Sequence, residues 1–165
     1  MSILTISGGV RLTSDVQPAV SAIGRRMHSS SSGDLSTTHV PFCVLKFVEG
    51  SEASLAVETL SGDQSSTWEQ LVASLPRDQC RMVIAQVPWT AHSDNVTRSR
   101  LIFISWVPLH GPTTKERMTA CMFAKGVVKQ VEQWIGSPVR VQAAGVDDLD
   151  LPDVQDRIRS RVTVK

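Results

Sequence analysis

Cationic and sulfur-containing side chains stand close together in residues 113–123, TTKERMTACMF. Lys115 and Arg117 precede Met118 and Met122, and a helix that binds in a partner's groove combines such apolar anchors with surrounding charge. Methionine suits this role because its flexible thioether adapts to an uneven surface. The alternative is an ordinary helix whose methionines lie in the core and whose cations are solvated. Residue types alone leave both interpretations open.

Residues that could support catalysis or metal binding do not form a recognisable constellation. Cys43, Cys80 and Cys121 have neither Cys–x–x–Cys spacing nor an adjacent histidine, which argues against a metal site and against a thiol nucleophile. The acidic stretch 147–150 fits a turn followed by a helix cap. No phosphate loop of the Gly-x-x-x-x-Gly-Lys type occurs. We therefore predict a protein that is not an enzyme and that needs no metal or cofactor.

Length and composition fit one globular domain. The 165 residues are 41% hydrophobic and 20% charged, which allows a single substantial core. The formal net charge of +1 gives no general attraction to nucleic acid, so nucleic acid is not an expected partner. No apolar run approaches the roughly 18 residues of a membrane span, and the N-terminus does not resemble a signal peptide. We expect a cytoplasmic monomer with reduced thiols.

The first half of the chain contains signals for one helix and two strands. Residues 1–12 are expected to form a flexible lead, after which Ser14 or Asp15 can cap a helix with apolar residues at helical spacing. The serine-rich stretch 29–38 is expected to be a flexible loop. Two strands that form a hairpin follow, at 39–48 and Ser54–Leu60.

A short helix and a second pair of strands come next. Thr67 can cap the helix, and Pro76 ends it. The two strands are expected at 81–87 and 101–107. The second strand, LIFISWV, is almost continuously apolar, which is typical of a strand buried on both faces. The polar link between the strands is long enough to project as a hairpin tip.

The longest helix follows Pro112, because Thr113 and Glu116 have the spacing of a capping box. Its periodicity predicts an inner stripe of Met118, Cys121 or Met122, Val128, Val131 and Ile135. Gly126 is a candidate kink point, and residues 136–138, Gly-Ser-Pro, end the helix.

A last strand at 139–143 and a closing helix from Asp150 through Arg161 complete the chain. One mixed sheet with helices on both faces would bury the apolar positions of all these elements. We therefore predict an α/β fold with a single central mixed β-sheet flanked by helices on both faces.

Several stretches, in order and at compatible spacing, resemble the actin-depolymerising factor/cofilin family. LIFISWVP followed by KERM is similar to the family's buried strand, which ends in Trp-x-Pro, and to its Lys-x-Lys/Arg-Met at the start of the long helix. SLPRDQCRMVIAQV, VQAAGVDDLD and SGGV resemble further family segments. The resemblance implies one ADF-homology domain over residues 1–165, with a gelsolin-like fold, and the binding of actin.

The resemblance also implies two actin-binding surfaces and a switch. The first surface, which contacts actin monomers, is Ser7, Gly8, Lys115, Arg117, Met118, Thr119 and Met122. The second, which contacts filaments, is the hairpin tip with Arg98 and Arg100, and the closing helix with Asp156, Arg157, Arg159 and Arg161. The same cationic patches are the implied site for phosphoinositide headgroups. Ser7 matches a serine whose phosphorylation places a dianion at the actin contact and switches relatives off.

Some residues depart from the family pattern. Two glycines instead of one follow Ser7, and Ser2 is a competing phosphate acceptor. Ala120 and Ala124 stand where relatives have a tyrosine and a lysine. The resemblance implies depolymerisation and severing of filaments. The alternatives are a monomer-sequestering relative and a filament-binding relative that does not sever, similar to coactosin.

Overall fold

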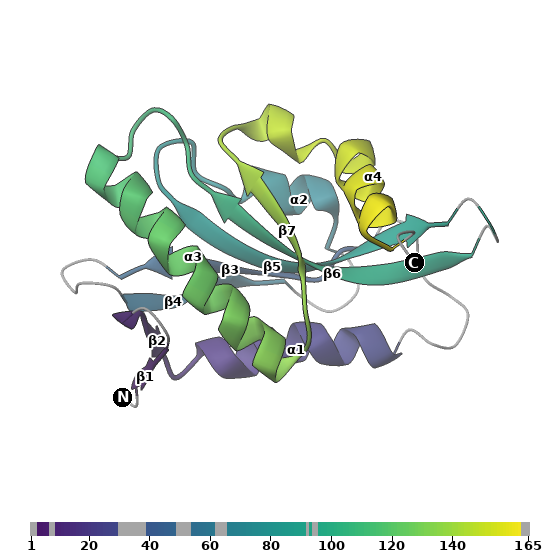
Figure 1. Ribbon diagram of the computed structural model, residues 1–165, viewed down its shortest axis with the longest axis horizontal. Helices are drawn as coiled ribbons and strands as arrows, with labels where there is room; N and C mark the ends of the chain where they lie inside the picture. The colour runs from purple at the N-terminus through teal and green to yellow at the C-terminus, as the bar shows by residue number, and fades with distance from the viewer. Residues whose placement is uncertain are drawn as a thin grey trace.

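Seven strands form one mixed sheet in the order β1-β2-β4-β3-β5-β6-β7 (Figure 1). The computed structural model describes residues 3–6, 9–29, 39–48, 54–61, 66–91, 93 and 96–162. The strands are β1 (Ile3–Thr5), β2 (Arg11–Thr13), β3 (Phe42–Phe47), β4 (Ser54–Leu60), β5 (Arg81–Thr90), β6 (Thr97–Trp106) and β7 (Val139–Ala143). β2 pairs parallel to β4 and β6 pairs parallel to β7, while all the other neighbours are antiparallel.

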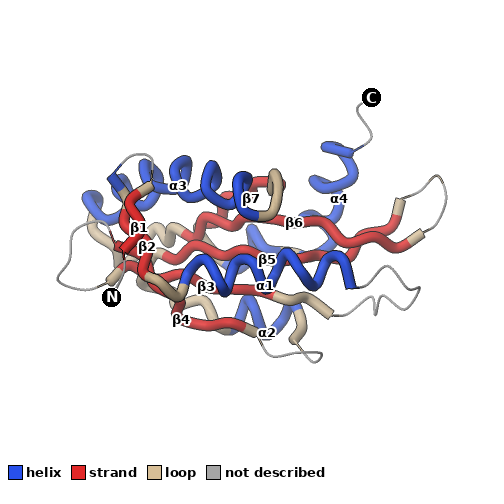
Figure 2. Tube along the Cα trace, turned by 90° about the horizontal axis from the view of Figure 1, so that it is seen from below, coloured by secondary structure: helices blue, strands red, loops and turns tan. Residues whose placement is uncertain are grey.

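Helices cover both faces of this sheet, which confirms the predicted fold class (Figure 2). They are α1 (Val16–Ser29), α2 (Trp68–Ala73), α3 (Thr114–Trp134) and α4 (Leu151–Val162), with a 3₁₀ helix η2 at Val146–Leu149. α1 and α3 share one core with Phe103, and α2 and α4 share the other with Ile104. Successive side chains of a strand point to opposite faces, so the apolar run of β6 serves both cores. Of the described helices, none combines the length and apolar content that a bilayer crossing requires.

Helix ends form where the sequence predicts them. The Thr113 hydroxyl accepts a hydrogen bond from the Glu116 N–H at 3.1 Å, and the Glu116 carboxylate accepts one from the Thr113 N–H at 2.8 Å. Thr67 caps α2 in the same way together with Gln70. Gly136 has a φ of +117° directly after the last turn of α3, a left-handed conformation that glycine adopts without strain. Side-chain caps and one glycine thus fix the limits of these helices.

Two short strands occupy part of the segment that we expected to be a flexible lead. β1 pairs with β2, and β2 joins the main sheet beside β4. Val10 and Leu12 are buried in the same core as α1, which anchors this segment. A three-residue strand gives too short an alternation to be recognised from sequence. Residues 30–38 of the serine-rich stretch lie outside the described residues.

The hairpin of β5 and β6 is longer than the sequence indicated. The two strands pair from Arg81 with Trp106 as far as Thr90 with Thr97, so most of the link expected to form a tip belongs to the sheet. The carbonyl of Pro88 accepts a hydrogen bond from Gln155 of α4 at 2.8 Å and therefore points away from β6. The N–H that proline lacks would point the same way, so its absence costs no pairing with β6.

Candidate protein-binding surfaces

The first turns of α3 expose two large apolar side chains. Met118 is 61% exposed and Met122 is 68% exposed, and Cys121 is exposed beside them. The buried residues of α3 are Ala120, Ala124, Gly126, Val127, Val128 and Val131. The predicted inner stripe is therefore right at Val128 and Val131 and wrong at the three positions that contain sulfur. Small alanine side chains let the start of the helix lie close to the sheet, which turns the methionines outward.

The two cations beside these methionines are held differently. Arg117 donates from Nη1 to the Leu109 carbonyl at 2.8 Å and from Nη2 to the Thr114 hydroxyl at 3.4 Å. Its guanidinium is therefore fixed against the loop that precedes α3. Lys115 is exposed, and its ammonium has no hydrogen-bond or ion-pair partner among the described residues. Thr119, one turn after Lys115, is half-buried.

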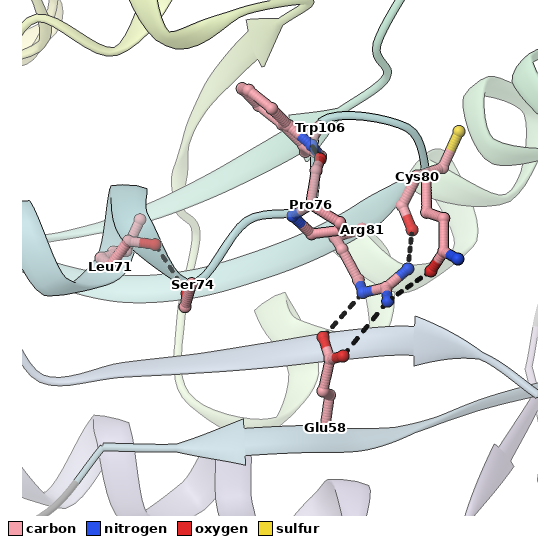
Figure 3. A network of polar contacts seen from close by, with 8 residues as sticks. Glu58, Leu71, Ser74, Pro76, Cys80, Arg81 and Trp106 are labelled. Carbon is pink, nitrogen blue, oxygen red and sulfur yellow. Dashed lines mark hydrogen bonds and ion pairs between the residues drawn. The ribbon is translucent and has the colours of Figure 1, made fainter. Parts of the chain in front are cut away.

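Contacts between two loops hold the start of α3 in its position beside the sheet. The indole Nε1 of Trp106 donates to the Pro76 carbonyl at 2.6 Å (Figure 3). Gly111 has a φ of +104°, and a Cβ there would lie 2.6 Å from the Cα of Asp78, so only glycine fits. A small buried cluster completes the contact between these loops and α3, and consists of Cys80, Val107 and Ala120. The loop before β5 thus supports the loop before α3.

A cleft of about 770 Å³ opens beside the start of α3. Lys115 and Thr119 line it from the helix, and Lys46 and Phe47 line it from β3. The cleft also contains Glu58, Gln79, Cys80, Arg81, Thr113 and Glu116. One group of predicted contact residues therefore faces a cavity, while the methionines project beyond it.

Leu109 is a further exposed apolar residue that sequence reasoning missed. Its side chain is 63% exposed, and its carbonyl is the acceptor for Arg117. The sequence did contain a signal for this exposure. Leu109 lies in a short loop, VPLHGP, between a buried strand and a capped helix, and so belongs to neither element's buried face. We include Leu109 with Met118 and Met122 in what we call the α3 surface, together with Lys115 and Arg117.

Arg98 and Arg100 lie within β6 and not at the hairpin tip, where we expected them. Arg98 is opposite Trp89, and its guanidinium carbon lies 5.8 Å from the centre of that ring, within the range of a cation–π contact. Arg98 is exposed, whereas Arg100 is half-buried. The expectation was wrong because pairing across the strands, which local sequence does not reveal, extends the ladder past both arginines.

The charged residues predicted on α4 divide into two groups. Arg159 donates from Nε to the Thr90 carbonyl at 2.8 Å, and its Nη1 lies 2.6 Å from the carboxylate of Asp156. These residues attach α4 to the end of β5. Arg157 and Arg161 are exposed. Arg159 contacts Thr90, and Arg98 is paired with Trp89, the residue before Thr90 in β5. We therefore group the exposed cations Arg98, Arg157 and Arg161 under the name α4 surface.

The N-terminal part of the predicted monomer surface, Ser7 and Gly8, lies outside the described residues. The other five residues of that prediction come together on the first turns of α3. Within the described ranges, no group of three side chains could hold a metal ion, and the three cysteines are free thiols. The described residues of the two predicted sites therefore lie on or beside the α3 surface and on or beside the α4 surface.

Comparisons with known proteins concern the family and the fold of the chain. A family model described as cofilin/tropomyosin-type actin-binding protein matches residues 21–159. Actin-depolymerizing factor 3 of Arabidopsis thaliana is 27% identical over 124 residues, which cover 75% of this chain and 85% of that protein. Cofilin of Streptomyces griseoflavus has a TM-score of 0.66 at 20% identity, covering 93% of this chain and 98% of that one. Coactosin of Entamoeba histolytica has a TM-score of 0.61 at 19% identity, covering 90% and 94%. The chain therefore belongs to the family of cofilin/tropomyosin-type actin-binding proteins.

Proposed function

We propose that this protein binds actin monomers and filaments and promotes filament depolymerisation and severing. The observation that carries the proposal is the α3 surface, where Met118 and Met122 are 61% and 68% exposed beside two cations. An exposed apolar pair flanked by cations suits insertion into the groove of a protein partner. Membership of the actin-binding family supports actin as that partner.

Monomer binding follows from the properties of the α3 surface. The methionines would displace water from a groove between two parts of an actin monomer, while Lys115 and Arg117 fix the orientation of the helix. Arg117 is already held by the Leu109 carbonyl, at 2.8 Å, so less side-chain entropy is lost when it meets a carboxylate.

Filament binding would add the α4 surface. Arg98, Arg157 and Arg161 are exposed cations that would raise the association rate and set the register on an acidic partner more than they raise affinity. Severing requires in addition that the protein binds a twisted filament better than a relaxed one, because a ligand shifts an equilibrium only by its differential affinity. Phosphoinositide headgroups would compete for the same cations.

The second candidate function is sequestration of monomers, or filament binding without severing. The similarity in fold to coactosin, with a TM-score of 0.61, keeps a non-severing relative in consideration. Co-sedimentation with filamentous actin separates the possibilities. Protein in the pellet with additional actin in the supernatant supports depolymerisation, and protein in the pellet without released actin supports a filament binder. Actin that stays soluble only at stoichiometric protein supports a sequesterer.

Removal of both cations of the α3 surface tests its role directly. We expect Lys115→Ala with Arg117→Ala to weaken monomer binding at least about tenfold. Truncation of interface cations next to buried anchors commonly reduces the binding free energy by about 1–2 kcal/mol or more. Lys129→Ala with Arg140→Ala removes two other exposed cations and is the matched control. Monomer affinity is measured by fluorescence titration, with the circular dichroism spectrum as a check on folding. Equal affinity of a folded double variant and the wild type would contradict the proposed site.

A further inference from the structure

The cleft beside α3 has a second wall that belongs to neither predicted surface. Lys46 and Phe47 of β3 face it opposite Lys115 and Thr119 of α3. Lys46 is exposed and, like Lys115, has no hydrogen-bond or ion-pair partner among the described residues. Which ligand the cleft can take depends on whether the other charges that line it are already compensated.

The buried arginine of the cleft is fully engaged by its neighbours. Arg81 is only 9% exposed, and its Nε and Nη2 lie 2.7 Å and 3.1 Å from the two oxygens of Glu58 (Figure 3). The guanidinium also donates to the Cys80 carbonyl and to the Gln79 side chain, both at 2.8 Å. Arg81 and Glu58 therefore form an ion pair, and four of the five N–H donors of Arg81 are used within the protein.

A local irregularity of the sheet brings these two residues together. The register of β3 and β4 shifts between Val44 and Leu45, which leaves Glu58 without an opposite residue in β3. An extra residue of this kind bends the strand and re-aims its side chain. Here the β-bulge lets Glu58 reach across β3 to Arg81 on β5, so the compensation of Arg81 is built into the sheet.

The other carboxylate of the cleft belongs to the capping box of α3 and keeps its negative charge. Glu116 accepts a hydrogen bond from the Thr113 N–H at 2.8 Å in the capping box of α3. A carboxylate in the first turn is further stabilised by the partial positive charge of the helix N-terminus. Three cations (Lys46, Arg81 and Lys115) and two carboxylates (Glu58 and Glu116) line the cleft, so its formal net charge is +1. The cations without an ion-pair partner among the described residues are Lys46 and Lys115, one on each wall, and they attract anions.

The shape and lining of the cleft favour a peptide over a small ion. A volume of about 770 Å³ exceeds what a single phosphate group needs, and Phe47 and Val48 give the β3 wall an apolar part. We propose that the cleft binds an acidic peptide segment whose carboxylates lie between Lys46 and Lys115. The proposal rests on the proposed function, because the segment would belong to the actin molecule that the α3 surface engages. Lys46 is then a contact residue outside both surfaces predicted from sequence.

Charge reversal at Lys46 tests this proposal against a matched control. Lys46→Glu and Lys129→Glu change the net charge equally and replace exposed lysines, but Lys129 lies on α3 outside the cleft. We expect Lys46→Glu to bind monomeric actin roughly 3- to 30-fold more weakly, because reversal removes an exposed ion pair and adds repulsion of similar size. The affinity of Lys129→Glu for monomeric actin should stay within about twofold of the wild type. The difference in affinity between Lys46→Glu and the wild type should shrink as the salt concentration is raised. Lys46→Gln should fall between the wild type and Lys46→Glu.

Other outcomes overturn the proposal. If both reversals weaken binding equally, the field of the whole molecule is responsible and the cleft is not. If Lys46→Glu reduces binding to phosphoinositide-containing vesicles but not to actin, the cleft serves membranes. Should the wild type fail to bind actin, the proposed function fails on its own, and NMR titration with an octaglutamate peptide then tests the cleft. Shifts at Gln79, Lys115 and Thr119 that Lys46→Glu abolishes would support it, and shifts elsewhere would refute it.

Discussion

Lys115 and Arg117 are two residues apart on α3, yet their hydrogen-bond environments differ. Arg117 uses two of its five N–H donors on the Leu109 carbonyl and the Thr114 hydroxyl. Lys115 lines the cleft and has no hydrogen-bond or ion-pair partner among the described residues. The first cation is held in place before any partner arrives, while the second contributes charge without a fixed geometry.

This difference predicts opposite responses to conservative exchange. We expect Arg117→Lys to weaken monomer binding about 3- to 10-fold, because an ammonium cannot hold the Leu109 carbonyl and present a planar fork to a partner at once. Lys115→Arg should change affinity by less than about twofold, since an exposed point charge tolerates either group. Titration of labelled actin monomers measures both. Equal tolerance at the two positions would show that the contact of Arg117 with the loop does not matter for binding.

At the scale of elements, α4 is attached to the sheet through polar side chains as well as through its apolar face. Gln155 and Arg159 donate to the carbonyls of Pro88 and Thr90, each at 2.8 Å, on the side of β5 that no strand covers there. Free carbonyls on an exposed strand edge invite pairing with other chains. α4 therefore protects this edge while it presents Arg157 and Arg161 to solvent.

Two substitutions on α4 should separate stability from binding. Arg159→Ala should lower the free energy of unfolding by about 0.5–1.5 kcal/mol, because the Thr90 carbonyl loses its donor. Arg157→Ala should leave stability within about 0.5 kcal/mol of the wild type, as expected for an exposed position, while it weakens filament binding. Urea unfolding and co-sedimentation measure the two effects. If only Arg159→Ala weakens filament binding, Arg159 and not Arg157 contacts the filament, which would contradict the prediction.

The elements that could be predicted from sequence are those whose limits depend on local signals. Capping boxes at Thr67 and Thr113 and the glycine at 136 act over a few residues, so α2 and α3 begin, and α3 ends, where expected. The long apolar run of β6 likewise predicted burial on both faces. The order of the elements and the layered arrangement followed from these signals.

The features that could not be predicted depend on distant partners. Periodicity alone placed Met118 inside the fold, because nothing in the local pattern shows that Ala120 and Ala124 make the close contact with the sheet. The family resemblance, in contrast, placed Met118 on an exposed surface, as observed. Arg98 was expected at a tip because polar residues near a turn do not reveal that Trp89 pairs with it. The charge balance of the cleft was beyond prediction too, since it depends on a β-bulge that brings Glu58 to Arg81.

At the scale of the whole molecule, one thiol makes global stability depend on pH. Cys43 lies fully buried in the core that α1 and α3 share. Burial, and secondly the Asp15 carboxylate, raise the pKa of its thiol from about 9.0 to about 12. The folded protein therefore keeps this proton at a pH where the unfolded chain releases it.

The sign of the resulting pH dependence can be tested. Below pH 9 the thiol is protonated in both the folded and the unfolded state, so Cys43 does not make the free energy of unfolding depend on pH. Between about pH 9 and pH 12 the unfolded state binds fewer protons, and the free energy of unfolding falls as pH rises. One such group contributes a loss of up to about 1.4 kcal/mol per pH unit. Urea unfolding of the wild type and of Cys43→Ala between pH 8 and pH 11 should show a shallower decline for the variant. Parallel curves would contradict a strongly raised pKa.

β6 is one continuous strand of ten residues, with its first residues at the α4 surface and its last residue at the loop to α3. At about 3.3 Å per residue, it is a rod of roughly 30 Å, braced by β5 along its length. Because every residue of β6 pairs with β5, the sheet fixes the distance between its two ends. A partner that contacts both ends must therefore match a separation that this protein sets in advance.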